Sequence, residues 1–263
     1  MAWSGILEWP FVVSGFAVGG MVGLTGVGGG ALMTPLLVLV FGIHPATAVG
    51  TDLFYAGLTK IAGSTVHGAN KAIEWKVVLR LASGSAPAAL LTLLTLSHLG
   101  FKSGHAGSAI SLALGIALLL TSVSLVFRPW LVERMAPRFD AMPDRAVGAF
   151  TVALGALLGV LVTISSVGAG AIGVTVLLML YPRMPTLRII ASDIVHAVPL
   201  TLIAGAGHWA MGSVDWSMLL SLLAGSVPGV MIASHFAARA PDKLLRGLLA
   251  GVLVLVGAKL AFQ

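Results

Sequence analysis

The chain has 263 residues, of which 58% are hydrophobic and only 9% are charged, and its mean hydropathy is +1.04. Soluble domains carry about 25% charged residues, so this composition excludes a soluble globular protein and indicates a polytopic membrane protein. The absence of cysteine excludes disulfides, thiolate metal sites and cysteine-based sulfur relays. The net charge of +6 fits basic loops on one side of a membrane, and we expect no nucleic-acid partner.

Apolar segments recur along the whole chain. They lie near 10–26, 30–43, 47–66, 76–97, 105–127, 146–162, 170–181, 187–207, 216–237 and 244–261. The segments 30–43 and 170–181 are short, because a full span needs about 20 residues. Each follows a glycine-rich break, so it is either a half-helix of a re-entrant hairpin or a short tilted crossing. No Lys or Arg precedes the first apolar segment, so we expect that segment to be retained and not cleaved as a signal peptide.

The two halves of the chain repeat one pattern, which indicates an internal duplication. The matched positions keep their order over about 75 residues. With an offset of 140 they are Gly15 and Gly155, Gly19 and Gly159, Thr25 and Ser165, and Gly28 and Gly168; with an offset of 141 they are Asp52 and Asp193, His67 and His208, Glu74 and Asp215, and Ser85 and Ser226. Each half has five crossings, or three crossings and a hairpin. Both counts are odd, so the halves should insert with opposite orientation.

The distribution of basic residues predicts the topology. With the N-terminus in the periplasm, 12 of the 15 Lys and Arg residues lie at the cytoplasmic side, as the positive-inside rule requires. We therefore predict an all-α polytopic membrane protein with two inverted-topology repeats of about five helical segments each. The first repeat spans 1–127, a cytoplasmic linker spans 128–145, and the second repeat spans 146–263.

Each half contains a glycine-rich break inside an apolar run. Gly26, Gly28 and Ala31 formally match a dinucleotide-binding fingerprint, but no strand or βαβ unit surrounds them, so we reject that interpretation. A helix that starts after a break points its N–H groups and the positive end of its dipole at the break, which suits an anion. The alternative for the glycines is close helix packing. The substrate-binding residues predicted at the breaks are Thr25, Gly26, Gly28, Gly29, Gly30, Ser165, Ser166, Gly168 and Gly170.

Four ionisable residues inside the apolar segments are further candidates. Lys60 lies deep in its span and its repeat partner is the neutral Thr201; it either neutralises an anionic substrate or extends its ammonium to the nearby loop. Asp52 and Asp193 either couple transport to an ion or cap their helices. His196 follows Asp193 by three residues and either relays protons or is a core histidine. No ligand spacing indicates a metal site, and we expect no cofactor.

One motif of the first half resembles a known family. Gly26-Val27-Gly28-Gly29-Gly30-Ala31-Leu32-Met33-Thr34-Pro35 is followed by His44-Pro45-Ala46-Thr47-Ala48-Val49-Gly50-Thr51, and the second half has Gly168-Ala169-Gly170-Ala171. This pattern is similar to the sulfite exporter TauE/SafE family (TSUP) over residues 10–260. The resemblance implies transport of sulfite, organosulfonates or related small anions, coupled to protons or Na⁺. Ala169 replaces Gly29 and Thr175 replaces Pro35 in the second half, so any symmetry of the site is approximate.

The sequence thus predicts a secondary transporter of a small sulfur-containing anion in the bacterial inner membrane. The anion would lie between the two breaks, with Lys60 supplying positive charge, and Asp52, Asp193 and His196 would serve coupling or gating. The alternatives are a passive anion channel, a structural membrane scaffold and a membrane-embedded enzyme. An enzyme would need a nucleophile–base pair or a metal cluster, and the sequence shows neither, so we expect no enzymatic activity.

Overall fold

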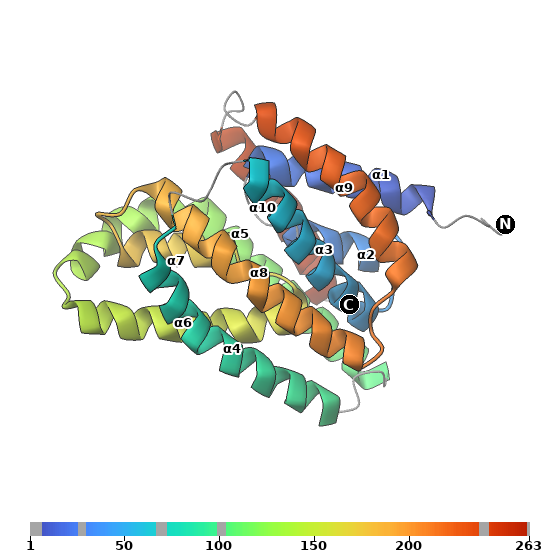
Figure 1. The fold of residues 1–263 in the computed structure, drawn as a ribbon, viewed down its shortest axis with the longest axis horizontal. Helices are drawn as coiled ribbons and strands as arrows, with labels where there is room; N and C mark the ends of the chain where they lie inside the picture. The colour runs from blue at the N-terminus through green and yellow to red at the C-terminus, as the bar shows by residue number, and fades with distance from the viewer. Residues whose placement is uncertain (1–6, 26–29, 67–72, 99–103, 237–241, 262–263) are drawn as a thin grey trace.

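The computed structural model describes residues 7–25, 30–66, 73–98, 104–236 and 242–261 (Figure 1). The described part consists of helices joined by short connections and contains no strand. The helices are α1 (Trp9–Thr25), α2 (Gly30–Leu39), α3 (Pro45–Val66), α4 (Trp75–His98), α5 (Gly104–Asp140), α6 (Asp144–Ser165), α7 (Ile172–Leu180), α8 (Thr186–Ala210), α9 (Trp216–Phe236) and α10 (Asp242–Ala261). This confirms the predicted all-α membrane class, because only a helix pairs all its backbone groups internally in lipid.

Helix length separates two kinds of element. Five described stretches, in α4, α5, α6, α8 and α9, are long and apolar enough to cross a membrane. By contrast α2 has 10 residues and α7 has 9, so each is about 15 Å long, or half of a hydrocarbon core about 30 Å thick. The short helices predicted after the two glycine breaks are therefore present.

The connection between the halves is shorter than the predicted linker 128–145. Helix α5 has 37 residues and continues through this stretch to Asp140, and only residues 141–143 separate it from α6. The polar sequence 131–136 is rich in Leu, Glu, Arg, Met and Ala, which are good helix formers, so the helix persists after its apolar part ends. The cytoplasmic placement of this stretch stays a prediction.

Two contacts show in which direction the short helices α2 and α7 run relative to the helices before them. The rings of Phe11, at the start of α1, and Phe41, just after α2, have centroids 4.8 Å apart. In the second half the hydroxyls of Thr151, near the start of α6, and Tyr181, just after α7, are 2.8 Å apart. These pairs correspond at an offset of 140. Each short helix therefore returns to the end where the preceding helix began, so α1–α2 and α6–α7 are hairpins and not pairs of crossings.

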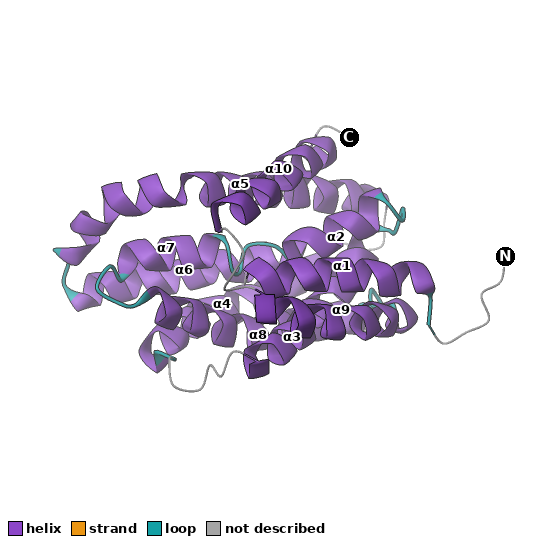
Figure 2. Cartoon of the chain, turned by 90° about the horizontal axis from the view of Figure 1, so that it is seen from above, coloured by secondary structure: helices purple, strands orange, loops and turns teal. Residues whose placement is uncertain are grey.

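The two hairpins open at opposite ends of the molecule. In Figure 2 the helices lie roughly along the long axis. The connection that follows α2 lies at the end near the N-terminus, and the connection that follows α7 lies at the far end (Figure 2). The two short helices thus begin near the middle of the molecule and run outward in opposite directions.

Each hairpin packs on a helix of the other half. Helix α1 lies against α9, and α6 lies against α4. Glycines allow this close approach: a Cβ at Gly19 would lie 2.6 Å from the backbone O of Ser226, and a Cβ at Gly159 would lie 2.5 Å from that of Ser85. Gly19 corresponds to Gly159 across the repeat, and Ser226 corresponds to Ser85. This exchange of packing partners is the arrangement expected when an approximate two-fold axis relates the two halves.

Neighbouring glycines of α1 test this packing. Gly19→Ala would force the α1–α9 interface apart and is expected to destabilise the fold by about 1–3 kcal/mol, as overpacking does. A Cβ at Gly20 would meet no atom within 4 Å, and Gly20→Ala replaces a poor helix former. The melting temperature of this variant should therefore equal or exceed that of the parent protein. Thermal unfolding in detergent measures both variants. Equal destabilisation by the two substitutions would contradict the α1–α9 contact.

Candidate functional site

The candidate site lies where α3 and α8 cross near the middle of the molecule. Close approach of these helices follows from small residues: a Cβ at Gly57 would lie 3.0 Å from Thr201 Oγ1, and one at Gly205 would lie 3.2 Å from the ring of Phe54. Helix α3 carries Asp52 and Lys60, and α8 carries Asp193 and His196. All four side chains are buried. The structure therefore brings together the four ionisable residues that the sequence singled out.

The second break, residues 166–171, has a backbone that favours glycine. Gly168 has φ 122° and Gly170 has φ 105°, and Ser166, which ends α6, has φ 58°. Positive φ is unfavourable for residues with a Cβ, which explains two of the predicted glycines. The Gly168 carbonyl accepts hydrogen bonds from the N–H groups of Ile172 (3.2 Å) and Gly173 (3.3 Å). The break thus leads directly into the first turn of α7.

The hydroxyls at this break differ in their hydrogen bonding. Ser165 donates to the Leu161 carbonyl (2.7 Å) and accepts from the Val167 N–H (3.2 Å), so it serves its own loop. The buried hydroxyls of Ser166 and Thr163 have no hydrogen-bond partner among the described residues. Ser166 lies beside Asp52, but its hydroxyl falls outside normal hydrogen-bond geometry. Ser166 is therefore a better candidate ligand for a substrate than Ser165.

The two matched carboxylates lie against the two short helices. Asp52 Oδ2 accepts a hydrogen bond from Thr34 Oγ1 of α2. The carboxylate of Asp193 interacts with the backbone of Gly170, and its Oδ1 lies so close to Gly173 in the first turn of α7 that a Cβ there would collide with it. The Oδ1 atoms of both aspartates are buried and have no hydrogen-bond partner in the part of the chain that the structure describes. Neither aspartate serves as the N-cap of its own helix, since each lies several residues after that helix begins.

Lys60 is the buried cation of the α3–α8 centre. Its side chain interacts electrostatically with both Asp193 and Asp52, and the residue is only 8% exposed. None of the ion pairs within 4 Å among the described residues includes it. A buried ammonium in a membrane costs about 2.5–3.5 kcal/mol on insertion scales, and here two nearby carboxylates offset part of that cost.

His196 and its repeat counterpart Tyr55 face matched serines. The Nε2 atom of His196 is 2.8 Å from Ser85 Oγ of α4. In the other half Ser226 Oγ of α9 is 3.2 Å from Thr59 Oγ1, and Tyr55 interacts electrostatically with the same serine and threonine. Both serines precede a proline in the middle of their helix by two residues. These polar pairs join the α3–α8 centre to α4 and α9.

Arg128 is a site residue that the sequence analysis did not identify. Its Nε donates to Thr175 Oγ1 (3.0 Å), its Nη2 lies 3.5 Å from the Ala171 carbonyl, and it interacts electrostatically with Asp193. The sequence placed it in the linker 128–145, because it follows an apolar run and precedes a proline. Its reach to α7 depends on the packing of α5 against α7, for which the sequence gives no signal.

Matched hydroxyls join the halves on either side of this centre. Thr51 of α3 accepts from the backbone N–H of Asp215 before α9 (3.0 Å). Ser192 of α8 accepts from the backbone N–H of Glu74 before α4 (2.9 Å). The two bonds correspond at an offset of 141. One lies at the end where the α1–α2 hairpin opens, and the other lies at the end where the α6–α7 hairpin opens.

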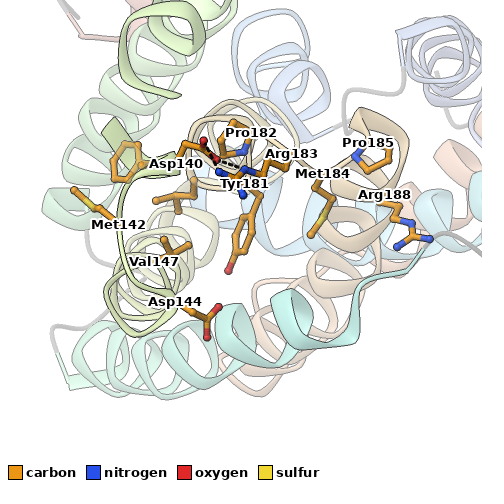
Figure 3. Close-up of a pocket in the computed structure, with 12 residues that line it drawn as sticks. Asp140, Met142, Asp144, Val147, Tyr181, Pro182, Arg183, Met184, Pro185 and Arg188 are labelled. Atoms are coloured by element: carbon orange, nitrogen blue, oxygen red, sulfur yellow. Dashed lines mark hydrogen bonds and ion pairs between the residues drawn. The ribbon is translucent and has the colours of Figure 1, made fainter. Parts of the chain in front are cut away.

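A separate pocket of about 410 Å³ lies at the open end of the α6–α7 hairpin. Figure 3 shows Arg183 paired with Asp140 on one side and the ring of Tyr181 directed toward the helix that carries Asp144. Arg183 Nε is 2.6 Å from Asp140 Oδ1, and Arg80 Nη2 is 2.6 Å from Asp144 Oδ2. The pocket shares no residue with the α3–α8 centre, so it is not the predicted substrate site.

The first break is less fully described. Gly26, Gly28 and Gly29 lie outside the described residues, and the structure describes Thr25 and Gly30 only as the last residue of α1 and the first of α2. The predicted approach of the two breaks at the membrane midplane therefore stays a prediction. Within the described residues, no group of three or more His, Cys, Asp or Glu side chains is arranged to hold a metal ion.

Comparison with known proteins identifies the family. The sequence pattern of "Sulfite exporter TauE/SafE" matches residues 11–260. The chain belongs to this family. The family match confirms the resemblance seen in the glycine motif and the repeat, and it covers both hairpins and the α3–α8 centre.

Relatives of this chain have the names of transporters. It is 38% identical to "Probable membrane transporter protein YjnA" of Bacillus subtilis (strain 168), over 95% of this chain and 98% of that protein. It is 23% identical to "Probable membrane transporter protein YdhB" of the same organism, over 94% and 97%, and 28% identical to "Probable membrane transporter protein MJ0441" of Methanocaldococcus jannaschii, over 74% and 69%. No solved structure matches the chain. The family relationship supports a multi-pass membrane transporter.

The backbone of the second break can be tested by one substitution. Gly170→Ala places a Cβ on a residue with φ 105°, which should destabilise the protein by about 1–2 kcal/mol. Gly247→Ala in α10 is the control, since a Cβ there meets nothing within 4 Å. Thermal unfolding should show a lower melting temperature for the Gly170 variant only. An unchanged melting temperature in that variant would contradict the strained break.

Proposed function

We propose that this protein is a secondary transporter of a small sulfur-containing oxyanion, such as sulfite or an organosulfonate, in the bacterial inner membrane. The observation that carries the proposal is the second break: a buried, glycine-shaped backbone at the start of α7 that includes the free hydroxyl of Ser166. Asp193 lies against this helix start, and Lys60 acts on Asp193 electrostatically. Backbone N–H groups at a helix start, a hydroxyl and an ammonium are groups that bind oxyanions. The family name supports the substrate class.

The substrate site would lie between the two breaks near the membrane midplane. Of the predicted residues, Ser166, Gly168, Gly170 and Lys60 supply the second half of this site, and Thr25, Gly26, Gly28, Gly29 and Gly30 would supply the first. Ser165 would hold the shape of the break, because its hydroxyl is already engaged. Lys60 would neutralise the charge of the anion.

The matched contacts support two inverted repeats that alternate in access. The hairpins open at opposite ends (Figure 2), and their packing partners are exchanged between the halves. The Thr51–Asp215 and Ser192–Glu74 bonds would be matched closures on the two sides of the site. Both are formed in this structure, so it would represent an occluded state of a carrier. Closure at both ends supports a carrier over a passive anion channel.

The orientation follows from charge. Lys76, Arg80, Arg183 and Arg188 gather at the end where α6–α7 opens and form ion pairs there. At the opposite end, the connections 40–44 and 211–215 contain no Lys or Arg. The positive-inside rule then assigns the basic end to the cytoplasm and the N-terminus to the periplasm.

Substitution of Lys60 tests the function. In proteoliposomes loaded with radiolabelled sulfite, Lys60→Met should abolish saturable flux, because the site loses its positive charge, while Lys60→Arg should keep part of it. Lys76→Met is the control: Lys76 is an exposed lysine at the basic end, and its loss should leave flux within about twofold, since exposed ion pairs are worth roughly 0–1 kcal/mol. Normal flux in Lys60→Met would refute the assigned role. Flux without saturation in the parent protein would favour the channel.

Single cysteines in this cysteine-free chain test the orientation. Arg138→Cys is exposed near the basic end of α5, and His44→Cys is exposed at the other end. An impermeant thiol reagent added to whole cells with a permeabilised outer membrane should label position 44 and should label position 138 only after the inner membrane is opened. The reverse pattern would overturn the proposed orientation.

A further inference from the structure

We propose that the hydroxyl of Thr121, in the middle of α5, is a further ligand of the substrate anion at the second break. This inference rests on the proposed function and deepens it, because it adds a helix to the substrate site. The oxygens of the anion would then be held by the break on one side and by α5 on the other.

Thr121 differs from the other buried threonines in its hydrogen bonding. The helices of the described residues bury the side chains of Thr34, Thr51, Thr59, Thr121, Thr151, Thr163, Thr175 and Thr201. For most of them the hydroxyl has a hydrogen-bond partner, which is a backbone group, a carboxylate or another hydroxyl. The hydroxyls of Thr121 in α5 and Thr163 in α6 have none among the described residues, and both residues are 0% exposed.

The unpaired hydroxyl of Thr121 is unfavourable for the fold. A threonine in a helix can donate to the carbonyl four residues earlier, as Thr151, Thr175 and Thr201 do here. Thr121 does not bond the Ala117 carbonyl or any other described group. Because a buried polar group without a hydrogen bond destabilises a protein, a hydroxyl kept in that state points to a use outside the fold. An oxyanion can accept the hydrogen bond that this hydroxyl leaves unmade.

The face of α5 that carries Thr121 packs on the start of α7. Thr121, Ser124 and Arg128 lie on this face, since they are three and four residues apart. Ser124 Oγ is 3.4 Å from the Ala171 carbonyl, and farther along α5 the Nε atom of Arg128 is 3.0 Å from Thr175 Oγ1. The contacts thus advance along α7 as they advance along α5. Thr121 is about 4.5 Å back along α5 from Ser124, which places it at the level of the residues before Ala171, in the second break.

A core cluster supports this level. Leu118 and Leu125, one turn before and one turn after Thr121, belong to the same cluster as Val167 and Ala171 of the second break. Ala31, in the first turn of α2, belongs to this cluster too. Thr121 therefore lies where the two short helices begin, and this is where the proposed substrate site lies.

The neighbouring Ser122 faces a different helix. Its hydroxyl donates to the Ala250 carbonyl of α10 (3.0 Å), and successive residues of a helix point about 100° apart. Thr121 and Ser122 are both buried and each has one hydroxyl, but only the hydroxyl of Ser122 bonds within the protein. Ser122 is therefore a matched control for Thr121.

A hydroxyl from α5 suits a sulfonate or sulfite anion. Such an anion has several oxygens on one sulfur, so it can accept hydrogen bonds from two walls of a site at once. Ser166 has an unpaired hydroxyl in the break, and Thr121 would supply a second one from α5. Because hydroxyls are neutral, they would add hydrogen bonds to the anion without a further buried charge.

The test measures binding of methanesulfonate to purified full-length protein by calorimetry, together with thermal unfolding of the same proteins without ligand. Thr121→Val keeps the shape of the side chain and removes the hydroxyl. Its Kd should rise by about tenfold or more, because a hydrogen bond to a charged group is lost. Its melting temperature should equal or exceed that of the parent protein, because no bond within the protein is lost. Thr121→Ser keeps a hydroxyl, so its Kd should stay within about threefold of the parent's.

Ser122→Ala should show the opposite pair of results. Its melting temperature should fall, because the hydrogen bond to Ala250 is lost, and its Kd should stay within about twofold of the parent's. The two variants together separate a hydroxyl that serves the substrate from one that serves the fold.

The outcomes distinguish this inference from the proposed function. Absence of methanesulfonate and sulfite binding by the parent protein would overturn the proposed substrate class and this inference with it. Binding by the parent protein that Thr121→Val leaves unchanged would overturn the inference alone. So would a lower melting temperature of Thr121→Val, failure of that variant to fold, or an equal loss of affinity in Ser122→Ala, since each would mean that α5 affects binding through the fold.

Discussion

A backbone that leaves the helix inside a membrane must find its hydrogen-bond partners within the protein, because lipid offers none. The second break shows how this chain meets that requirement. Ile172 and Gly173 donate back to Gly168, and the Ala171 carbonyl accepts from Thr175 at 2.7 Å and lies 3.4 Å from Ser124 Oγ of α5. The break must therefore lie deep among other helices. The packing of α5 against α7 helps to meet this requirement at the second break.

Duplication supplies the surrounding helices. A single half could not enclose its own hairpin, since α1 packs on α9 of the other half and α6 packs on α4. The contacts are made by glycines, which let backbones approach closely where lipid gives no hydrophobic driving force between helices. The bonds of Thr51 and Ser192 also run between halves. The two halves therefore form one cooperative unit in which each completes the other.

The departures from symmetry lie where charge is concentrated. Lys60 has the neutral Thr201 as its counterpart. Lys60 and Arg128 both act on Asp193, so the second half-site is more positive than matched sequence positions alone would imply. A symmetric scaffold suits alternating access, whereas a small anion needs only one set of compensating charges. In the proposed mechanism, the asymmetry would therefore lie at the substrate site and not in the framework.

The sequence alone determined the membrane class, the duplication, the short helices after glycine breaks and the central ionisable residues, because hydropathy, backbone freedom and the cost of buried charge are local properties. Only the tertiary structure decided that α1–α2 and α6–α7 are hairpins, since the Phe11–Phe41 and Thr151–Tyr181 contacts join positions that sequence cannot place side by side. The tertiary structure also showed that the side chain of Arg128, a residue of the predicted linker, reaches from α5 to Thr175 of α7. Both outcomes depend on the path of the chain in three dimensions, and in a membrane that path is set by which helices can satisfy a broken backbone.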